Sequence, residues 1–319
     1  MAFVPQTLDW PADSAVLLVH GVGNAKAGDY DGLLAQTRQI LDPAGTKFAI
    51  YQLYYDEYND WLVEKTKAAN LINAARARIG GLVGDADVAP AVAETVGDVI
   101  WPVLSRDARF MIKEMYLAQL HQILKDGERA GHEPQFQRLH IICHSLGCFH
   151  TYEALHTAAR IPGRMLGPVS MGVRFGSVIF MASPVQLIRT VGRAMGAAVP
   201  RPTELATLDP AGLSIPAETT QWGDIVQSAD RIVSITGALD PVGGYFFRRR
   251  AGDAYMDLPG QESRIDPQAV LNINTKAEWI AAIQSVVDGR GVPAVAVNNP
   301  HSWEGYVARH APDLRQWLG

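Results

Sequence analysis

The sequence predicts an α/β fold with a mostly parallel central sheet flanked by helices. Short apolar runs rich in β-branched residues alternate with longer segments whose apolar residues recur at helical spacing. The runs are apolar at almost every position, which is typical of strands covered by helices on both faces. The chain has 319 residues, of which 48% are hydrophobic and 19% charged, so it can bury a sizeable core. We expect a single α/β domain over residues 1–319.

The first predicted strand, "AVLLVH" at 15–20, shows this apolar pattern most clearly. The further predicted strands lie at 47–55, 138–145, 176–183, 231–237 and 293–298, and 269–275 is either another strand or part of an excursion. Helical patterns at 149–160 and 278–287 separate some of them. Strand and helix therefore alternate along most of the chain, as in βαβ units.

Two stretches interrupt this alternation. Residues 56–126 carry helical patterns, the last of them with apolar residues at Phe110, Met115, Leu117, Leu120 and Leu124. This is more than one crossover requires, so the stretch is either an inserted helical cap or a set of longer crossover helices. Residues 192–222 are rich in Pro, Gly, Ala and Thr with little periodicity, which predicts a lid or binding loop, or a mobile segment.

Charge and hydropathy restrict the class of protein. The net charge of −5 argues against nucleic acid as the main partner, because phosphate binding needs a positive face. The N-terminus lacks the pattern of a signal peptide, and no uncharged apolar run reaches the roughly 18 residues of a membrane span. The chain has only two cysteines, Cys143 and Cys148, and this low count favours a reducing compartment. We expect a cytoplasmic protein without a transmembrane segment, and the oligomeric state stays open.

Ser145 is the candidate nucleophile. It follows the apolar run "LHIIC" and precedes a helical pattern, so it lies where a parallel strand ends and ligands bind. The pattern Cys143-His144-Ser145-Leu146-Gly147 matches G-x-S-x-G except that cysteine replaces the first glycine. A plain helix N-cap is the alternative role for this serine. The x-S-x-G copy at Ser170 has no preceding strand.

A serine nucleophile needs a base, and the base needs an orienting carboxylate. Asp240 comes just after the predicted strand at 231–237, and His301 just after the one at 293–298. Three separate strand ends thus offer the three groups in the order Ser, Asp, His. The rival acids are Asp257 and Asp266, and the rival base is His310, which falls within a helical pattern.

A fourth strand end carries glycines that let the backbone turn sharply and present N–H groups to a ligand. The stretch "LLVHGVGN" places His20 and Gly21 directly after an apolar run, with Gly23 two residues on. A plain glycine-rich turn is the alternative interpretation. The spacing of the next glycine, Gly28, does not fit a dinucleotide-binding G-x-G-x-x-G.

These motifs together resemble the α/β-hydrolase superfamily, in particular its lipase- and esterase-like members. The resemblance lies in "HGVG", "CHSLG", "FMASPV", "ALDPV" and "NPHSWEGY", which extend from residue 20 to residue 306. It implies an α/β-hydrolase fold, a Ser145–His301–Asp240 triad, and an oxyanion hole formed by the N–H groups of Val22 and Leu146. It implies hydrolysis of a carboxylic ester through an acyl-enzyme, with no cofactor or metal.

The residues around Ser145 also fit two other interpretations. A metal site built from His140, Cys143, His144, Cys148 and His150 would need a second ligand pair that the chain lacks, and neighbouring strand residues point to opposite faces. The chain can also be a catalytically silent binding protein with a hydrolase fold. On the same triad, a thioesterase or an acyltransferase is a further alternative.

The substrate is less defined than the chemistry. Aromatic residues cluster in "YQLYYDEYNDW", and we take His20, Tyr54 and Tyr55 as candidate substrate-binding residues, with packing of a crossover helix as the alternative. The run "FFRRR" at 246–250 is either a site for an anionic group or a solvated charge run. These features favour a small-molecule or lipid-like ester.

Overall fold

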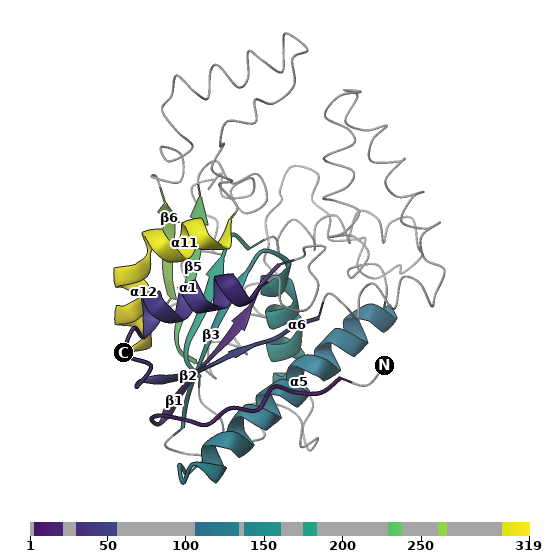
Figure 1. Ribbon diagram of the computed structural model, residues 1–319. Coiled ribbons are helices and arrows are strands. Elements are labelled where there is room, and N and C mark those ends of the chain that lie inside the picture. Colours follow the sequence, from purple (N-terminus) through teal and green to yellow (C-terminus); the bar gives the residue numbers. More distant parts are fainter. Residues whose placement is uncertain are drawn as a thin grey trace, which may run out of the picture.

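A parallel sheet of six strands organises the part of the chain that the structure describes (Figure 1). This computed structural model describes residues 3–21, 30–55, 106–133, 137–160, 175–183, 229–237, 261–266 and 302–319. The strands are β1 (Ser14–Val19), β2 (Phe48–Gln52), β3 (Arg138–His144), β4 (Phe175–Met181), β5 (Ala229–Gly237) and β6 (Gln261–Asp266). Every neighbouring pair is parallel, in the order β2-β1-β3-β4-β5-β6.

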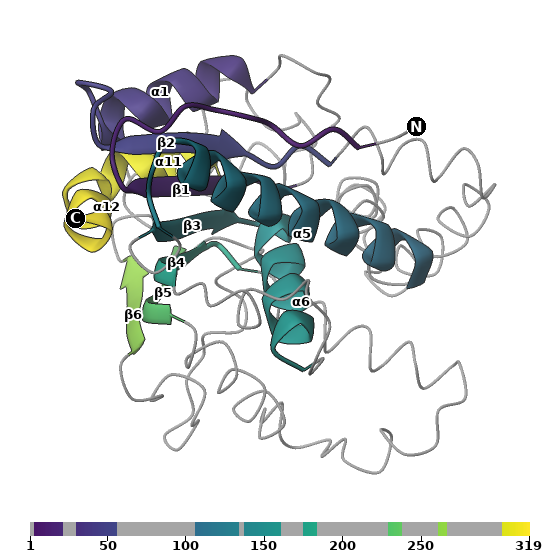
Figure 2. The ribbon, with the colours of Figure 1, turned by 90° about the horizontal axis from the view of Figure 1, so that it is seen from below.

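Helices cover both faces of this sheet (Figure 2). On one face lie α5 (Arg106–Arg129) and α6 (Leu146–Arg160), and on the other lie α1 (Asp31–Leu41), α11 (Trp303–Arg309) and α12 (Ala311–Leu318). The α/β class with a parallel sheet between helices, as predicted, is confirmed. None of the described helices combines the length and apolar character needed to cross a bilayer.

Strand β1 shows why the chain forms a sheet with two covered faces. Ala15, Leu17 and Val19 are buried in the core under α5 and α6. Val16 and Leu18 are buried in the core under α1, α11 and α12. Because successive side chains of a strand point to opposite faces, a strand between two helical layers must be apolar at every position. Its neighbours are β2 and β3, which places it inside the sheet.

All six described strands are parallel, but the side of the sheet on which the chain adds its next strand changes once. From β1 the chain moves to one side to form β2, and it then returns past β1 to form β3 and the following strands. In doubly wound sheets, ligands bind beyond the carboxyl ends of the strands on either side of such a reversal. Here those two strands are β1 and β3, so His20–Gly21 and Ser145 lie at the expected place.

The predicted strands at 15–20, 47–55, 138–145, 176–183 and 231–237 are confirmed as β1 to β5. The expected strands at 293–298 and 269–275, and the expected helix at 278–287, lie outside the described residues. Strand β6 was not predicted, because its sequence, QESRID, holds a single apolar residue. Backbone pairing with β5 forms it, and such pairing requires no apolar pattern.

The long helix α5 forms the last part of the stretch at 56–126, where helical patterns were expected. Met115, Leu117, Leu120 and Leu124 are buried as expected, and α5 packs beside α6 on the sheet. Phe110 was expected in the same stripe, but its side chain is 57% exposed. At 3.6 residues per turn, Phe110 is rotated by about 200° from buried Ile112, so it faces away from the sheet. Residues 56–105 and 192–222 lie outside the described residues.

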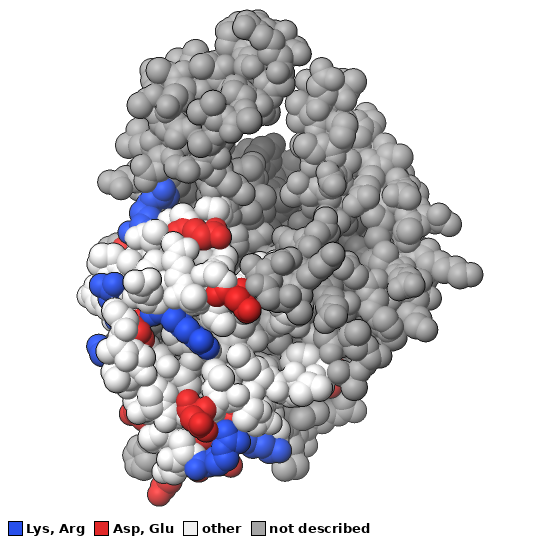
Figure 3. Space-filling view, viewed as in Figure 1, with Lys and Arg blue, Asp and Glu red and all other residues white. Residues whose placement is uncertain are grey.

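Side chains of opposite charge adjoin on the described surface. In the view of Figure 3, Lys and Arg side chains lie next to Asp and Glu side chains over the described elements. Arg129 of α5, for example, lies 3.6 Å from the exposed carboxylate of Asp9. The mild negative charge of the chain is therefore not gathered into one patch on the described part of that face.

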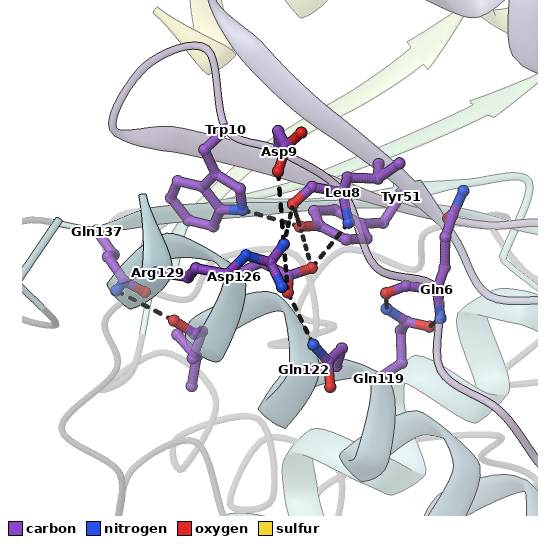
Figure 4. Close-up of polar contacts among 11 residues, drawn as sticks. Gln6, Leu8, Asp9, Trp10, Tyr51, Gln119, Gln122, Asp126, Arg129 and Gln137 are labelled. Carbon is purple, nitrogen blue, oxygen red and sulfur yellow. Dashed lines mark hydrogen bonds and ion pairs between the residues drawn. The ribbon is translucent and has the colours of Figure 1, made fainter. Parts of the chain in front are cut away.

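A buried polar network fastens the N-terminal segment to α5 and β2 (Figure 4). One carboxylate oxygen of Asp126 accepts hydrogen bonds from the Leu8 N–H and from the Tyr51 hydroxyl, both at 2.9 Å. The Trp10 indole N–H donates to the Tyr51 oxygen at 2.9 Å, and the Gln122 amide donates to the other Asp126 oxygen at 2.7 Å. Burial raises the pKa of Tyr51 well above its usual value, so its hydroxyl stays a donor.

We predict that Asp126→Ala lowers the free energy of unfolding by about 2–4 kcal/mol. The Leu8 N–H loses its acceptor, and the buried Tyr51 hydroxyl keeps only a long contact of 3.4 Å to the Leu8 carbonyl. Urea unfolding followed by circular dichroism measures the change. Asp9→Ala is the matched control, since it also removes a carboxylate beside Arg129, but a fully exposed one. Equal effects of the two variants would contradict the network's role.

Candidate functional site

Ser145 occupies a sharp bend between β3 and α6. Its φ of +53° lies in the left-handed region, which few residues other than glycine adopt. The Ser145 N–H donates to the Met181 carbonyl at 3.1 Å, and the Cys148 N–H donates to the Ser145 carbonyl at 3.0 Å. Strained backbone of this kind persists only where its surroundings hold it, and it concentrates at functional sites. A plain N-cap needs no such conformation, because N-cap residues usually have extended φ and ψ.

Two glycines allow the chain to pack tightly around this bend. A Cβ atom on Gly147 would lie 2.3 Å from the Val19 carbonyl oxygen and 2.5 Å from that of His20. A Cβ atom on Gly21 would lie 2.5 Å from the Ser145 Cβ and 2.8 Å from its Oγ. Real Cβ atoms do not approach other atoms this closely. Glycine at both positions therefore lets the end of β1 lie directly against the serine.

The cysteine that replaces the first glycine of the motif fits without disturbing the bend. Cys143 is fully buried in the core under α5 and α6. Its thiol donates to the Ile179 carbonyl oxygen at 3.3 Å on the neighbouring strand β4. The side chain thus fills space in the core under α5 and α6.

The start of α6 places a backbone N–H group beside Ser145. Leu146 is the first residue of the helix, and the first N–H groups of a helix have no acceptor within it. Its side chain is fully buried, which fixes the backbone beside Ser145. Such N–H groups can stabilise an oxyanion. Val22, the other expected donor, lies outside the described residues.

Packing of His144 brings a distant part of the chain to the same edge. The His144 ring lies 5.9 Å from the Trp303 ring and 5.8 Å from the Tyr306 ring, centroid to centroid, and both aromatic residues belong to α11. The Trp303 indole N–H donates to the Thr37 hydroxyl at 3.0 Å, which ties α11 to α1. The residue before Ser145 is therefore in contact with the first turn of α11.

The residue after His301 caps the start of helix α11. Ser302 is the N-cap of α11, and its hydroxyl accepts a hydrogen bond from the Gly305 N–H at 3.1 Å. His301 and Asp240 themselves lie outside the described residues. The contact of His144 with Trp303 brings position 303, two residues after His301, close to position 144. Strand β5 ends at Gly237, three residues before Asp240.

The structure describes two of the alternative candidates for the acid and the base, Asp266 and His310. Asp266 is the last residue of β6. His310 lies at the junction of α11 and α12, where its Nδ1 is 3.2 Å from an Asp313 carboxylate oxygen in the next helix. Asp257 and Ser170 lie outside the described residues.

The histidines and cysteines near Ser145 are divided between the two faces of the sheet. His144 contacts α11, whereas Cys143 is buried under α5 and α6. His150 of α6 has its ring 4.7 Å from that of Tyr55. Among the described residues no three His, Cys, Asp or Glu side chains are placed to hold a metal ion. The two thiols are buried and unbridged, and burial raises the pKa of the Cys148 thiol.

An aromatic cluster surrounds His20 at the ends of β1 and β2. The His20 ring is stacked on Tyr30 at 3.6 Å between centroids and lies 6.1 Å from Tyr55 and 6.3 Å from Tyr54. The Tyr55 hydroxyl donates to the His20 carbonyl at 2.7 Å. The structure thus brings together the three residues named as candidate substrate-binding groups. Tyr30 was missed, because it precedes α1 and only the turn of the chain after β1 brings it to His20.

The His20 imidazole is neutral in this environment. Burial lowers its pKa to about 4, and its hydrogen bond to the Gly21 carbonyl only partly opposes the effect. The ring nitrogen Nδ1 lies 2.8 Å from that carbonyl oxygen. Because a carbonyl oxygen can only accept, the proton of the neutral ring is on Nδ1.

No model of a protein family fits this sequence, and no curated protein matches it. The function is therefore inferred from the residues and their geometry.

We predict that acid destabilises the protein through its buried histidines. Burial lowers the pKa of His20 and His140 to about 4 and that of His150 to about 3, below the usual 6.5. The unfolded chain therefore binds more protons than the folded one between these values, and stability falls as the pH drops below about 6.5. At pH 5 the lowered pKa of each histidine reduces the free energy of unfolding by about 2 kcal/mol.

His150→Phe tests this prediction, because it keeps the aromatic contact with Tyr55 and removes the titrating group. We expect the loss of unfolding free energy between pH 7 and pH 5 to be smaller by about 2 kcal/mol in the variant. Urea unfolding at the two pH values gives the measurement. An unchanged pH dependence would show that His150 does not stay neutral in the folded protein.

Proposed function

We propose that this protein is a serine hydrolase with an α/β-hydrolase fold that cleaves a carboxylic ester, lipase- or esterase-like in its chemistry. The observation that carries the proposal is the conformation of Ser145, a serine at positive φ where β3 meets α6 and in contact with Gly21. A hydroxyl on such a bend projects beyond the sheet edge, where a substrate carbonyl can reach it.

The sheet order supports the assignment of the other two catalytic groups. With β1 and β3 on either side of the reversal, the nucleophile follows β3, and β5, whose carboxyl end lies at the same edge of the sheet, ends three residues before Asp240. His301 precedes α11 by two residues, and α11 touches His144. A triad of Ser145, His301 and Asp240 is therefore compatible with the fold, although the three lie far apart in sequence.

The proposed reaction is acyl transfer in two steps. His301 takes the proton of the Ser145 hydroxyl as its oxygen attacks the ester carbonyl, and it then gives this proton to the leaving alcohol. Water, deprotonated by His301, attacks the acyl-enzyme, and the carboxylic acid leaves as Ser145 regains its proton. Asp240 orients His301 and stabilises its charged form. No cofactor enters this chemistry.

Backbone N–H groups stabilise the charge that develops on the carbonyl oxygen. Leu146 at the first position of α6 supplies one donor, and Val22, next to Gly21, is assigned the other. Donors fixed in a buried backbone need no reorganisation when the charge forms, and losing one costs about 10²–10³ in kcat.

A tagged fluorophosphonate tests the proposal, because this probe reacts with an activated serine whatever the substrate. We expect one adduct per chain, located by peptide mass spectrometry on Ser145 and absent in Ser145→Ala. In His301→Ala the labelling rate falls by at least about 10³, since the serine loses its base. A folded protein that remains unlabelled would contradict the proposal and favour a catalytically silent binding protein.

Gly21→Ala is predicted to slow this labelling by at least about tenfold, because the added methyl group displaces Ser145 from its position. The matched control is Gly32→Ala in α1, where an added methyl group meets no atom within 4 Å. We expect the control to label at the wild-type rate. Equal labelling of the two variants would show that contact between Gly21 and Ser145 does not affect the reaction.

A further inference from the structure

His20 holds a buried hydrogen-bond acceptor for which the described residues provide no donor. Its Nε2 is buried and without a hydrogen-bond partner in the structure. Since Nδ1 donates to the Gly21 carbonyl, the neutral ring leaves a lone pair on Nε2. Buried polar atoms are nearly always paired, so an unpaired one at the binding edge of a sheet indicates a ligand or a bound water.

The position of His20 connects this acceptor to the proposed nucleophile. His20 precedes Gly21, which lies against the Ser145 side chain, and its carbonyl oxygen, together with that of Val19, leaves no room for a side chain at Gly147. Two other buried histidines with an unpaired Nε2, His140 and His150, lack this connection. His140 lies within β3, away from its carboxyl end, and His150 lies on α6 with its ring against that of Tyr55.

The surroundings of His20 favour a neutral ligand group with carbon and hydroxyl surfaces. Tyr30 and Tyr54 are half-buried and lie 5.9 Å apart, ring to ring, beside the imidazole. Aromatic faces pack against the carbon atoms of a polyol or hydroxylated chain, and the ring nitrogen accepts from its hydroxyl. The pKa of His20, about 4, keeps this acceptor free of a proton at neutral pH.

We propose that His20 Nε2 accepts a hydrogen bond from a hydroxyl group of the substrate, so that the protein prefers hydroxylated esters to plain alkyl esters. This inference rests on the proposed function, whose site it extends. The hydroxyl belongs either to the alcohol part of the ester or to its acyl part, and the two sources are separated by the choice of ester.

Nitrogen-15 NMR of the histidine side chains in Ser145→Ala tests binding without turnover. The added esters are 1-monobutyrin, with hydroxyls on the alcohol part, ethyl 3-hydroxybutyrate, with one on the acyl part, and n-propyl butyrate, with none. We expect the His20 Nε2 resonance to move upfield with at least one hydroxylated ester and to stay in place with n-propyl butyrate. A resonance unmoved by all three would assign Nε2 to a bound water and overturn the inference.

Hydrolysis by the unmodified Ser145 protein gives the second test. We expect a kcat/KM about 5- to 10-fold higher for the preferred hydroxylated ester than for its plain analogue, n-propyl butyrate or ethyl butyrate. His20→Asn keeps a donor near the position of Nδ1 and removes the acceptor at Nε2, so the preference disappears. His20→Gln can present an amide oxygen near the position of Nε2, and it retains part of the preference.

Tyr54→Phe is the matched control, because it removes a neighbouring hydroxyl and keeps the ring. If this variant loses the preference and His20→Asn keeps it, the tyrosine is the acceptor and the inference is wrong. Equal rates for hydroxylated and plain esters with Ser145 still labelled would overturn the inference alone. Absence of labelling would contradict the proposed function instead, and the NMR result would still decide what Nε2 binds.

Discussion

Close packing of the first turn of α6 against the end of β1 is the constraint on which the candidate site depends. The Val19 and His20 carbonyl oxygens leave no room for a side chain at Gly147, and the Ser145 side chain leaves none at Gly21. These contacts keep Ser145 at positive φ, a conformation that costs about 1–3 kcal/mol and persists only where its surroundings impose it. The side chains of β1 and β3, buried in the cores on both faces of the sheet, hold the two strands that lead into this arrangement.

Neutral imidazoles characterise the interior around this bend. Burial lowers the pKa of His20 and His150 far below neutrality, so neither ring carries a charge where a substrate carbonyl would be attacked. In an interior of low polarity, hydrogen bonds from fixed donors are stronger than in water. The same burial leaves His20 with an unshared lone pair, and for this reason we assign it to the substrate and not to the core.

The sequence indicated most of the sheet, because β1 and β3 lie between two helical layers and must be apolar throughout. It also indicated the bend at Ser145, because the serine motif has a fixed place between strand and helix. It did not indicate β6, which is polar and held by backbone pairing. It also did not indicate that the Phe110 side chain of α5 faces away from the sheet. Tyr30 was missed since its stacking on His20 is a tertiary contact across a turn, and periodicity describes only one element at a time.

Active-site titration with p-nitrophenyl butyrate tests the central claim most directly, because it detects the acyl-enzyme itself. If the bend makes Ser145 the nucleophile, mixing releases a rapid burst of about one p-nitrophenolate per chain. Butyrate is then found on Ser145, and the burst is absent from Ser145→Ala. A burst that persists in the Ser145→Ala protein, or an acyl group recovered on another residue, would contradict the account.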